Sequence, residues 1–360
     1  TPLLIRMFYS QAWFLKLSAL SLLLPATALP LKAVAYLEGN ILERTLPTEV
    51  DRIIETKMCE FCTIFAADFS EADLSGAFFK GSLIVDSRFV EASFIEANLS
   101  QTELDVVYLS DADLRLANFN EASFRVVIFN DADMTEANLS NAKVFHSFFK
   151  NANLSKADFK NARIEIVNFV GADLTHTDFT GADLKFVSFV NTDLRNANLN
   201  QTYLEKIVYD TRTQFPEGFI LPIGEMYLLA PYSSVTDIIA YDLDLAGQDL
   251  TGLDISDSEI SADFSRATLN EAIFENTSLK FSTFTDTNLC DAQLIDANLF
   301  RADFQGSDLR GADLSSATID DTNFQGATYN VGTQFPEGFD PAAAGAVLSD
   351  EASADCPPLE

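Results

Sequence analysis

A five-residue period runs through most of this chain and limits what it can fold into. Residues 67–211 divide into 29 consecutive pentapeptides, and every central residue is apolar, most often Phe or Leu. The residue two positions before the centre is nearly always small, and the residue just before it is often Asp or Asn. A second run of 14 pentapeptides covers residues 262–331, and one residue is missing near Ser261.

Neither an α-helix nor a flat strand keeps residues of this period on one side. Five residues turn a helix by about 500°, so successive centres would drift by about 140°. On a flat strand, an odd period places successive apolar residues on opposite faces. The pattern fits a chain in which each pentapeptide forms one short side and a corner, and coils stack into a solenoid. The centres then form the core, for example Phe69, Leu74, Phe94, Leu114, Phe159, Leu184, Phe264 and Leu309.

A longer period of 20 residues sets the number of sides in each coil. Bulky residues recur at this spacing, as at Val106, Val126, Ile166 and Phe186. Twenty residues are four pentapeptides, so the sequence predicts a square tube with one bulky corner. Larger inward residues at 107, 127, 167, 187 and 207 widen the core on that side.

The tandem A-[D/N]-[L/F]-x-x pattern resembles the pentapeptide-repeat family. This resemblance implies an all-β fold, the right-handed quadrilateral β-helix. The lead-in at residues 56–62, TKMCEFC, is similar to that of exported cyanobacterial members.

The N-terminal part of the chain precedes the repeats. Residues 1–35 contain basic residues, an apolar run at 17–28 and small-residue cleavage sites, a pattern typical of a signal peptide. The alternatives are an uncleaved anchor or a buried hydrophobic hairpin. Residues 36–66 are predicted to cap the tube with a short helix that has Thr48 as N-cap and Val50, Ile53, Ile54 and Met58 on one face.

The repeats themselves form two blocks, at 67–219 and 242–339, joined by a connector at 220–241 and followed by a tail at 340–360. Both blocks end in the sequence TQFPEGF, at 213–219 and 333–339. Pro and Gly interrupt the repeat there, and the two Phe residues are expected to cover the open core. The repetition indicates a duplicated module that carries its own terminator.

Little in the sequence points to catalysis or to a cofactor. Cys59 and Cys62 are interpreted as packing residues, disulfide-linked after export, with a redox pair or half a zinc site as alternatives. Cys290 falls on an outward position. His146 and His176 lie 30 residues apart, an odd number of sides, which argues against a shared metal. The recurrent Asp and Asn residues are expected to bond neighbouring coils at corners, with a calcium ladder as the alternative.

One set of residues is a candidate interaction surface, an apolar strip along the bulky corner. We call it the apolar strip. A covered, thicker core wall is the alternative interpretation. The strip comprises Val106, Tyr108, Val126, Ile128, Phe145, Phe148, Ile166 and Phe186.

The net charge of −31 argues against a nucleic-acid ligand, because phosphates repel such a surface. The sequence favours a non-enzymatic scaffold or interaction protein in an exported compartment, the thylakoid lumen or the periplasm. Its partner would be another protein or a second copy of the chain, with no cofactor and no membrane contact after cleavage. The alternative, implied by the resemblance to quinolone-resistance proteins, is an acidic DNA mimic that inhibits gyrase. That function would require a cytoplasmic protein whose N-terminal segment is not a working signal.

Overall fold

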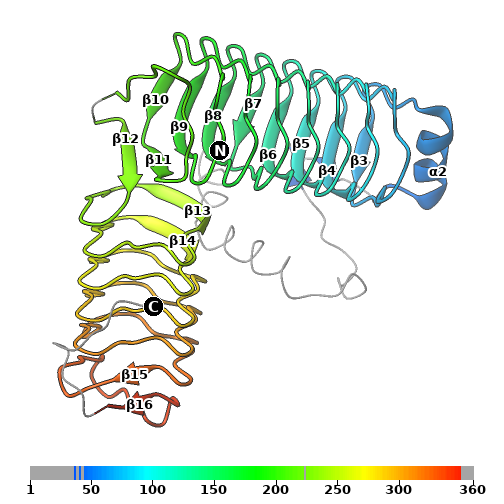
Figure 1. The fold of residues 1–360 in the computed structure, drawn as a ribbon. Coiled ribbons are helices and arrows are strands. Elements are labelled where there is room, and N and C mark those ends of the chain that lie inside the picture. Colours follow the sequence, from blue (N-terminus) through cyan, green and yellow to red (C-terminus); the bar gives the residue numbers. More distant parts are fainter. Residues whose placement is uncertain (1–35, 38–39, 42–43, 223, 350–360) are drawn as a thin grey trace. The chain divides into compact units, whose positions relative to one another are not determined.

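The computed structural model describes residues 36–37, 40–41, 44–222 and 224–349 (Figure 1). The predicted signal peptide at 1–35 lies outside these residues, as does the end of the tail. The chain divides into two units, Thr1–Glu43 and Arg44–Glu360. In the first unit, strands β1 (Tyr36–Leu37) and β2 (Asn40–Ile41) pair antiparallel.

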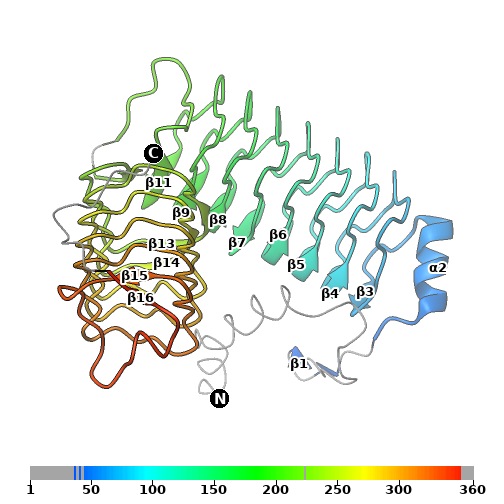
Figure 2. The same cartoon turned by 60° about the horizontal axis from the view of Figure 1, so that its bottom comes forward.

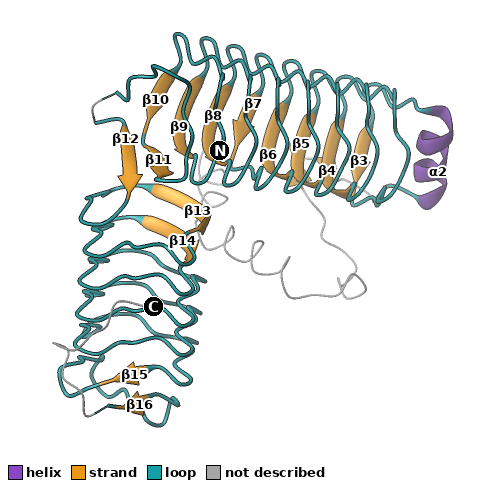
Figure 3. Cartoon of the chain, viewed as in Figure 1, coloured by secondary structure: helices purple, strands orange, loops and turns teal. Residues whose placement is uncertain are grey.

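The second unit consists almost entirely of coils in which short parallel strands alternate with turns (Figure 3). Its one described helix is α2 (Pro47–Thr56). One sheet has the strand order β12-β11-β9-β8-β7-β6-β5-β4-β3, and β10 pairs with β9. The strands are β3 (Thr63–Phe65), β4 (Leu83–Arg88), β5 (Glu103–Tyr108), β6 (Ser123–Ile128), β7 (Lys143–Phe145), β8 (Arg163–Asn168), β9 (Asp183–Ser188), β10 (Tyr203–Glu205), β11 (Ile207–Asp210), β12 (Met226–Leu229), β13 (Ile239–Asp244), β14 (Glu259–Asp263), β15 (Thr328–Tyr329) and β16 (Val347–Leu348).

Successive coils stack in parallel with a register of 20 residues. Leu104 of β5 lies beside Ile84 of β4 on one side and Phe124 of β6 on the other. The backbone N–H of Phe69 donates to the carbonyl of Arg88 at 2.8 Å, and equivalent bonds recur from coil to coil along the axis. This register confirms the four-sided solenoid that the sequence predicts.

The second residue after each centre forms the corner and lies in the left-handed region. Examples are Glu71, with a φ of 63°, and Glu91, with a φ of 59°. The Asp or Asn before the centre stabilises the same corner, since Asp68 Oδ1 accepts the backbone N–H of Ser70 at 3.0 Å. The prediction that these residues mainly bond neighbouring coils is therefore wrong. Their short side chains reach the backbone two residues ahead more easily.

The centres of the pentapeptides fill the tube. Phe69, Phe159 and Leu184 have at most 1% of their surface exposed. The other expected centres, Leu74, Phe94, Leu114, Phe264 and Leu309, are equally buried. Phe rings stack along the axis; for example, the ring centroids of Phe129 and Phe149 are 4.7 Å apart.

Helix α2 lies across the end of the coils beyond β3 (Figure 2). Ile53 is fully buried in the core, and Val50 and Ile54 pack against it. Leu46, not Thr48, is the N-cap, and Pro47 begins the helix, since its fixed φ suits the first turn. Met58 lies beyond the helix and is exposed, because Lys57 ends the helix in the left-handed conformation.

Two separate hydrophobic cores run through the second unit. The first core extends from Ile53 to Ile207, and we call its coils the first stack. The second core already contains Leu229, Val235 and Ile238, so the coils of the second stack begin before residue 242. Bridges such as Asp254↔Ile273 have a spacing of 19 residues, in agreement with the residue missing near Ser261.

The two terminator sequences cover the ends of their stacks in the same way. Phe215 and Phe219 stack with centroids 5.4 Å apart and pack against the first core. Phe335 and Phe339, 5.3 Å apart, pack against the second.

Candidate functional site

The apolar strip follows a corner that lies within β5, β6, β8 and β9 and just after β7. All eight of its residues are half-buried, so the strip is neither a fully exposed surface nor part of the core. The strip has two parts, one that another strand covers and one that it does not. Strand β13 of the second stack lies close to β8 and β9, and it makes no contact of similar extent with β5 or β6.

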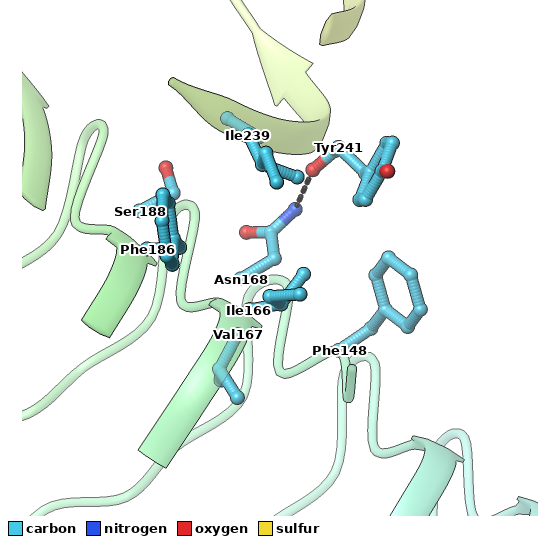
Figure 4. A pocket seen from close by; sticks show the side chains of 9 residues that line it. Phe148, Ile166, Val167, Asn168, Phe186, Ser188, Ile239 and Tyr241 are labelled. Atoms are coloured by element: carbon cyan, nitrogen blue, oxygen red, sulfur yellow. Dashed lines mark hydrogen bonds between the residues drawn. The ribbon is translucent and has the colours of Figure 1, made fainter. Parts of the chain in front are cut away.

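Asn168 holds β13 against the covered part of the strip. Its side-chain amide donates to the carbonyl of Tyr241 at 2.8 Å (Figure 4) and to the carbonyl of Asp242 at 3.0 Å. Its Oδ1 accepts the backbone N–H of Val170 at 2.6 Å, so the side chain is fixed at both ends. We call this contact between the stacks the joint.

Charged and aromatic groups complete the joint. The ring of His146 stacks on Tyr241 with centroids 5.2 Å apart, and burial lowers the pKa of His146 to about 4. Lys150 pairs with Asp242 at 3.7 Å. Burial raises the pKa of the Asp242 carboxyl, while Lys150 opposes that shift. Burial also raises the pKa of Tyr241, and the neighbouring Glu259 carboxylate adds to the effect.

The first stack also supplies part of the second core. Val170 and Val190, which face outward from the first stack, are buried in the second core together with Val208. Arg212 adds a polar link, since it binds the buried carboxylate of Asp210 at 2.6 Å and donates to the Asp244 carbonyl. The second stack therefore begins in direct contact with the outer side of the first stack, and residues of that side are part of its core.

The joint leaves a recess between the stacks, shown in Figure 4. It is lined by Phe148, Ile166, Phe186, Ile239 and their neighbours. The recess has a volume of about 10 Å³, which is room for one water molecule at most. It is a packing defect and not a ligand site.

The other part of the strip consists of Val106, Tyr108, Val126 and Ile128, and we call it the open strip. Within the described residues, no hydrogen bond, ion pair or ring contact links it to the second stack. Tyr108 lies under the guanidinium of Arg88, 5.4 Å from the ring centroid.

Two carboxyl groups lie beside the open strip. Burial raises the pKa of Asp105, although Arg125 pairs with it. Burial and the neighbouring Asp105 both raise the pKa of Asp86. Asp105 Oδ1 is buried and accepts no hydrogen bond from the described residues. The surroundings of the open strip are therefore acidic.

The cysteines have structural positions. Cys59 and Cys62 are joined by a disulfide at the capped end of the first stack, and Cys59 is buried. Cys290 follows the centre Leu289, an outward position of the repeat, and it is buried and disulfide-bonded. The residue directly after a centre faces outward from its own coil and is buried where another segment covers it, as at Val170 and Val190.

Other kinds of site are not evident in the described part of the chain. No group of three or more His, Cys, Asp or Glu side chains there could hold a metal ion. His146 and His176 stand at corners of different sides, as their spacing predicts. None of the helices among the described residues has the length and apolarity to span a membrane.

Sequence reasoning missed the residues that make the joint. Asn168 follows the common Asn pattern and gave no distinct signal. Val170 and Val190 gave no distinct signal either, because Val90 holds the equivalent position in an earlier coil and is not part of the second core.

Comparison with solved structures found several similar proteins. The protein alr5209 from Nostoc PCC 7120 is 36% identical over 28% of this chain and 84% of its own length, with a TM-score of 0.27. A thylakoid-lumen protein of Arabidopsis thaliana, AT2G44920, is 30% identical over 29% of this chain and 68% of its own, with a TM-score of 0.19. HetL from Nostoc sp. PCC 7120 is 17% identical over 83% and 99%, with a TM-score of 0.23.

No protein with a curated description matches the chain. Two family profiles do. The pentapeptide repeat region profile matches residues 122–199, and the profile of eight pentapeptide repeats matches residues 65–101, 260–294 and 292–328. With these matches across both stacks, and with the four-sided coils described above, the chain belongs to the pentapeptide-repeat family.

Proposed function

We propose that this protein is a non-enzymatic scaffold that binds another protein on the side of its first stack. The observation that carries the proposal is the apolar strip, of which the second stack covers only one part. Two stacks fixed at a joint provide a rigid frame, and a half-buried apolar surface on such a frame is suited to protein contact.

We further propose that it works in an exported compartment, the thylakoid lumen or the periplasm. The pattern of residues 1–35 supports this location, as does the Cys59–Cys62 disulfide, because disulfides persist in oxidising compartments.

Fractionation and cross-linking in the native host test both parts of this proposal. A C-terminally tagged full-length chain should appear in the exported fraction at the mass of a cleaved protein. Chemical cross-linking in intact cells should give one dominant adduct with another protein. A chain that stays uncleaved in the cytoplasm contradicts the location, and the absence of any adduct contradicts the scaffold.

The alternative function is an acidic DNA mimic. The net charge of −31 favours it, as do stacked acidic corners such as Glu71, Glu91, Asp111 and Asp131. A gyrase supercoiling assay with the purified full-length chain separates the two functions. The scaffold proposal expects no inhibition at micromolar protein, whereas inhibition there would establish the mimic.

A further inference from the structure

We propose that the open strip binds a partner segment that has an apolar face flanked by Lys or Arg residues. This inference rests on the proposed interaction function, and it names the surface and the chemistry of what binds there. Backbone conformation, the structure of the joint and local charge support it independently.

Two corners of the open strip have an unusual backbone conformation. Val106 and Val126 occupy corners with φ values of 56° and 57°. A β-branched residue in the left-handed region is an outlier, because its branched side chain crowds the backbone. Among the described residues with positive φ, only Val106, Val126 and Ile166 are β-branched, and all three belong to the apolar strip. Such outliers persist where another function requires them.

The joint shows what such a residue is used for. Ile166 has the same corner conformation, with a φ of 55°, and it lines the recess together with Ile239 and Tyr241 of the second stack. Val106 and Val126 stand in the same row, three and two coils before it. The open strip thus continues an interface that already exists within the chain, with the same unfavourable corners.

The open strip differs from the covered part in one respect that limits its occupant. Tyr108 and Ile128 stand where the covered part has Asn168, so they offer no amide to the carbonyls of an added strand. The open strip is therefore suited to side-chain contact, such as the apolar face of a helix, rather than to a bound strand like β13.

Charge decides which apolar segment fits. Acidic side chains flank the open strip, and the two arginines nearby are engaged with Tyr108 and Asp105. A second copy of a chain with a net charge of −31 would be repelled, whereas Lys or Arg would be attracted. Asp86 stands in the same row of corners as Val106, Glu103 and Asp105 lie in β5, and Asp111 and Asp131 occupy the next corner along their coils.

Binding of a designed amphipathic helical peptide of Leu and Lys to the full-length chain tests the inference, with a Leu and Glu peptide of the same length for comparison. The variant V106N/V126N should bind the Leu and Lys peptide about tenfold more weakly. Asn is suited to the corner, as Asn141 and Asn151 show, and the variant keeps every charge. The matched control is Leu116→Asn, an exposed corner on another side, which should bind like the parent.

The unfolding temperature of the same variants is a second measurement, and it should not fall when peptide binding weakens. Because Asn relieves the backbone strain, V106N/V126N should unfold at an equal or higher temperature than the parent. Weaker binding together with unchanged or greater stability is the signature of a site. Equal peptide binding by parent and variant, or equal binding of the Leu and Glu peptide, would overturn the inference.

Photo-crosslinking identifies the occupant without relying on stability. Benzoylphenylalanine replaces Ile128 in one chain and Leu116 in the control. The proposal expects an adduct with the Leu and Lys peptide from position 128 only. A cross-link between two copies of the chain, or to residues 1–43 of the same chain, would assign the surface to that occupant and overturn the proposal.

These outcomes are separable from failure of the proposed function. If cross-linking in cells gives a protein adduct that V106N/V126N leaves unchanged, the scaffold stands and the open strip is not its binding surface. If no adduct forms in cells but the peptide binds the open strip specifically, the surface stands and the scaffold function does not.

Discussion

At the scale of single residues, each side of a coil depends on one large inward residue and one corner. The centres are packed against centres of the coils before and after them, so each is enclosed on all sides. Corner residues, in contrast, are selected by backbone conformation, and Asp, Asn, Glu and Gly occupy most of them. Substitutions at the two kinds of position should therefore differ greatly in cost.

Phe159→Ala tests the importance of a centre. Phe159 is fully buried and stacks on Phe179 with centroids 5.0 Å apart. Truncation leaves a cavity that neighbouring coils cannot close, so the free energy of unfolding should fall by about 3–5 kcal/mol in denaturant titration. The control, Leu116→Ala at a corner that is 48% exposed, should change it by less than about 0.5 kcal/mol. Similar costs for both variants would contradict this account.

At the scale of elements, the joint between β8, β9 and β13 is the feature that most changes the interpretation of the sequence. The bulky corner could be predicted from the 20-residue period, and so could its ambiguity between interaction surface and covered wall. The sequence could not show which part of the strip is covered, because the residues that bind Asn168 there lie 73 and 74 positions further along the chain. Periodicity reports on neighbouring coils and carries no information on contacts between stacks.

Asn168→Asp tests the polar part of the joint. The aspartate keeps the acceptor for the N–H of Val170 but places a carboxylate against the carbonyls of Tyr241 and Asp242. The free energy of unfolding should fall by about 1–3 kcal/mol, and the amides of β13 should exchange hydrogen faster. Asn153→Asp is the matched control, since Asp133 and Asp173 hold the equivalent position in adjacent coils. If the two variants behave alike, the amide of Asn168 does not stabilise the joint.

His146→Phe tests the response of the joint to acid. The pKa of His146 is lowered to about 4 in the folded protein, below its ordinary value of about 6.5. The unfolded chain therefore binds the extra proton between these values, and this histidine lowers stability as the pH falls from about 6.5 to about 4. Its contribution is on the order of 3 kcal/mol and is absent above about pH 7.

The variant should retain the ring stack on Tyr241, because Phe186 occupies an equivalent corner with a similar φ. Denaturant titrations of parent and variant at several pH values give the difference directly. The variant should be more stable relative to the parent at pH 4.5 than at pH 7.5. A constant difference would show that the histidine does not titrate with unfolding.

At the scale of the whole molecule, most of the fold could be predicted from the sequence. The centres, the four sides and the terminators all follow from the periods of five and 20 residues. The division into two cores could not, because Val170 and Val190 look like ordinary positions until the second stack covers them. The second stack also begins before residue 242, since Val235 and Ala240 continue the five-residue spacing of Leu245 and Leu250 backward, and a centre as small as Ala240 hides that continuation in the sequence.

The excess of acidic residues should make stability depend on salt. With 54 acidic and 23 basic residues, carboxylates repel one another along each row of corners. Salt screens this repulsion, so the unfolding temperature should rise between about 0.01 M and 1 M NaCl. Uncharged sucrose at equal osmolality controls for general solute effects. A falling temperature would mean that ion pairs between coils, such as Lys156–Glu136 and Arg301–Asp321, outweigh the repulsion.

The direction of the backbone hydrogen bonds has a mechanical consequence. Because they run along the axis from each coil to the next, a pull on the two ends of a stack loads the coil boundaries in series. The outermost coil can then peel away while the others stay intact. Each event would release one coil of 20 residues, about 70 Å of extended chain. Such a molecule would give way under tension in small, equal steps instead of a single rupture.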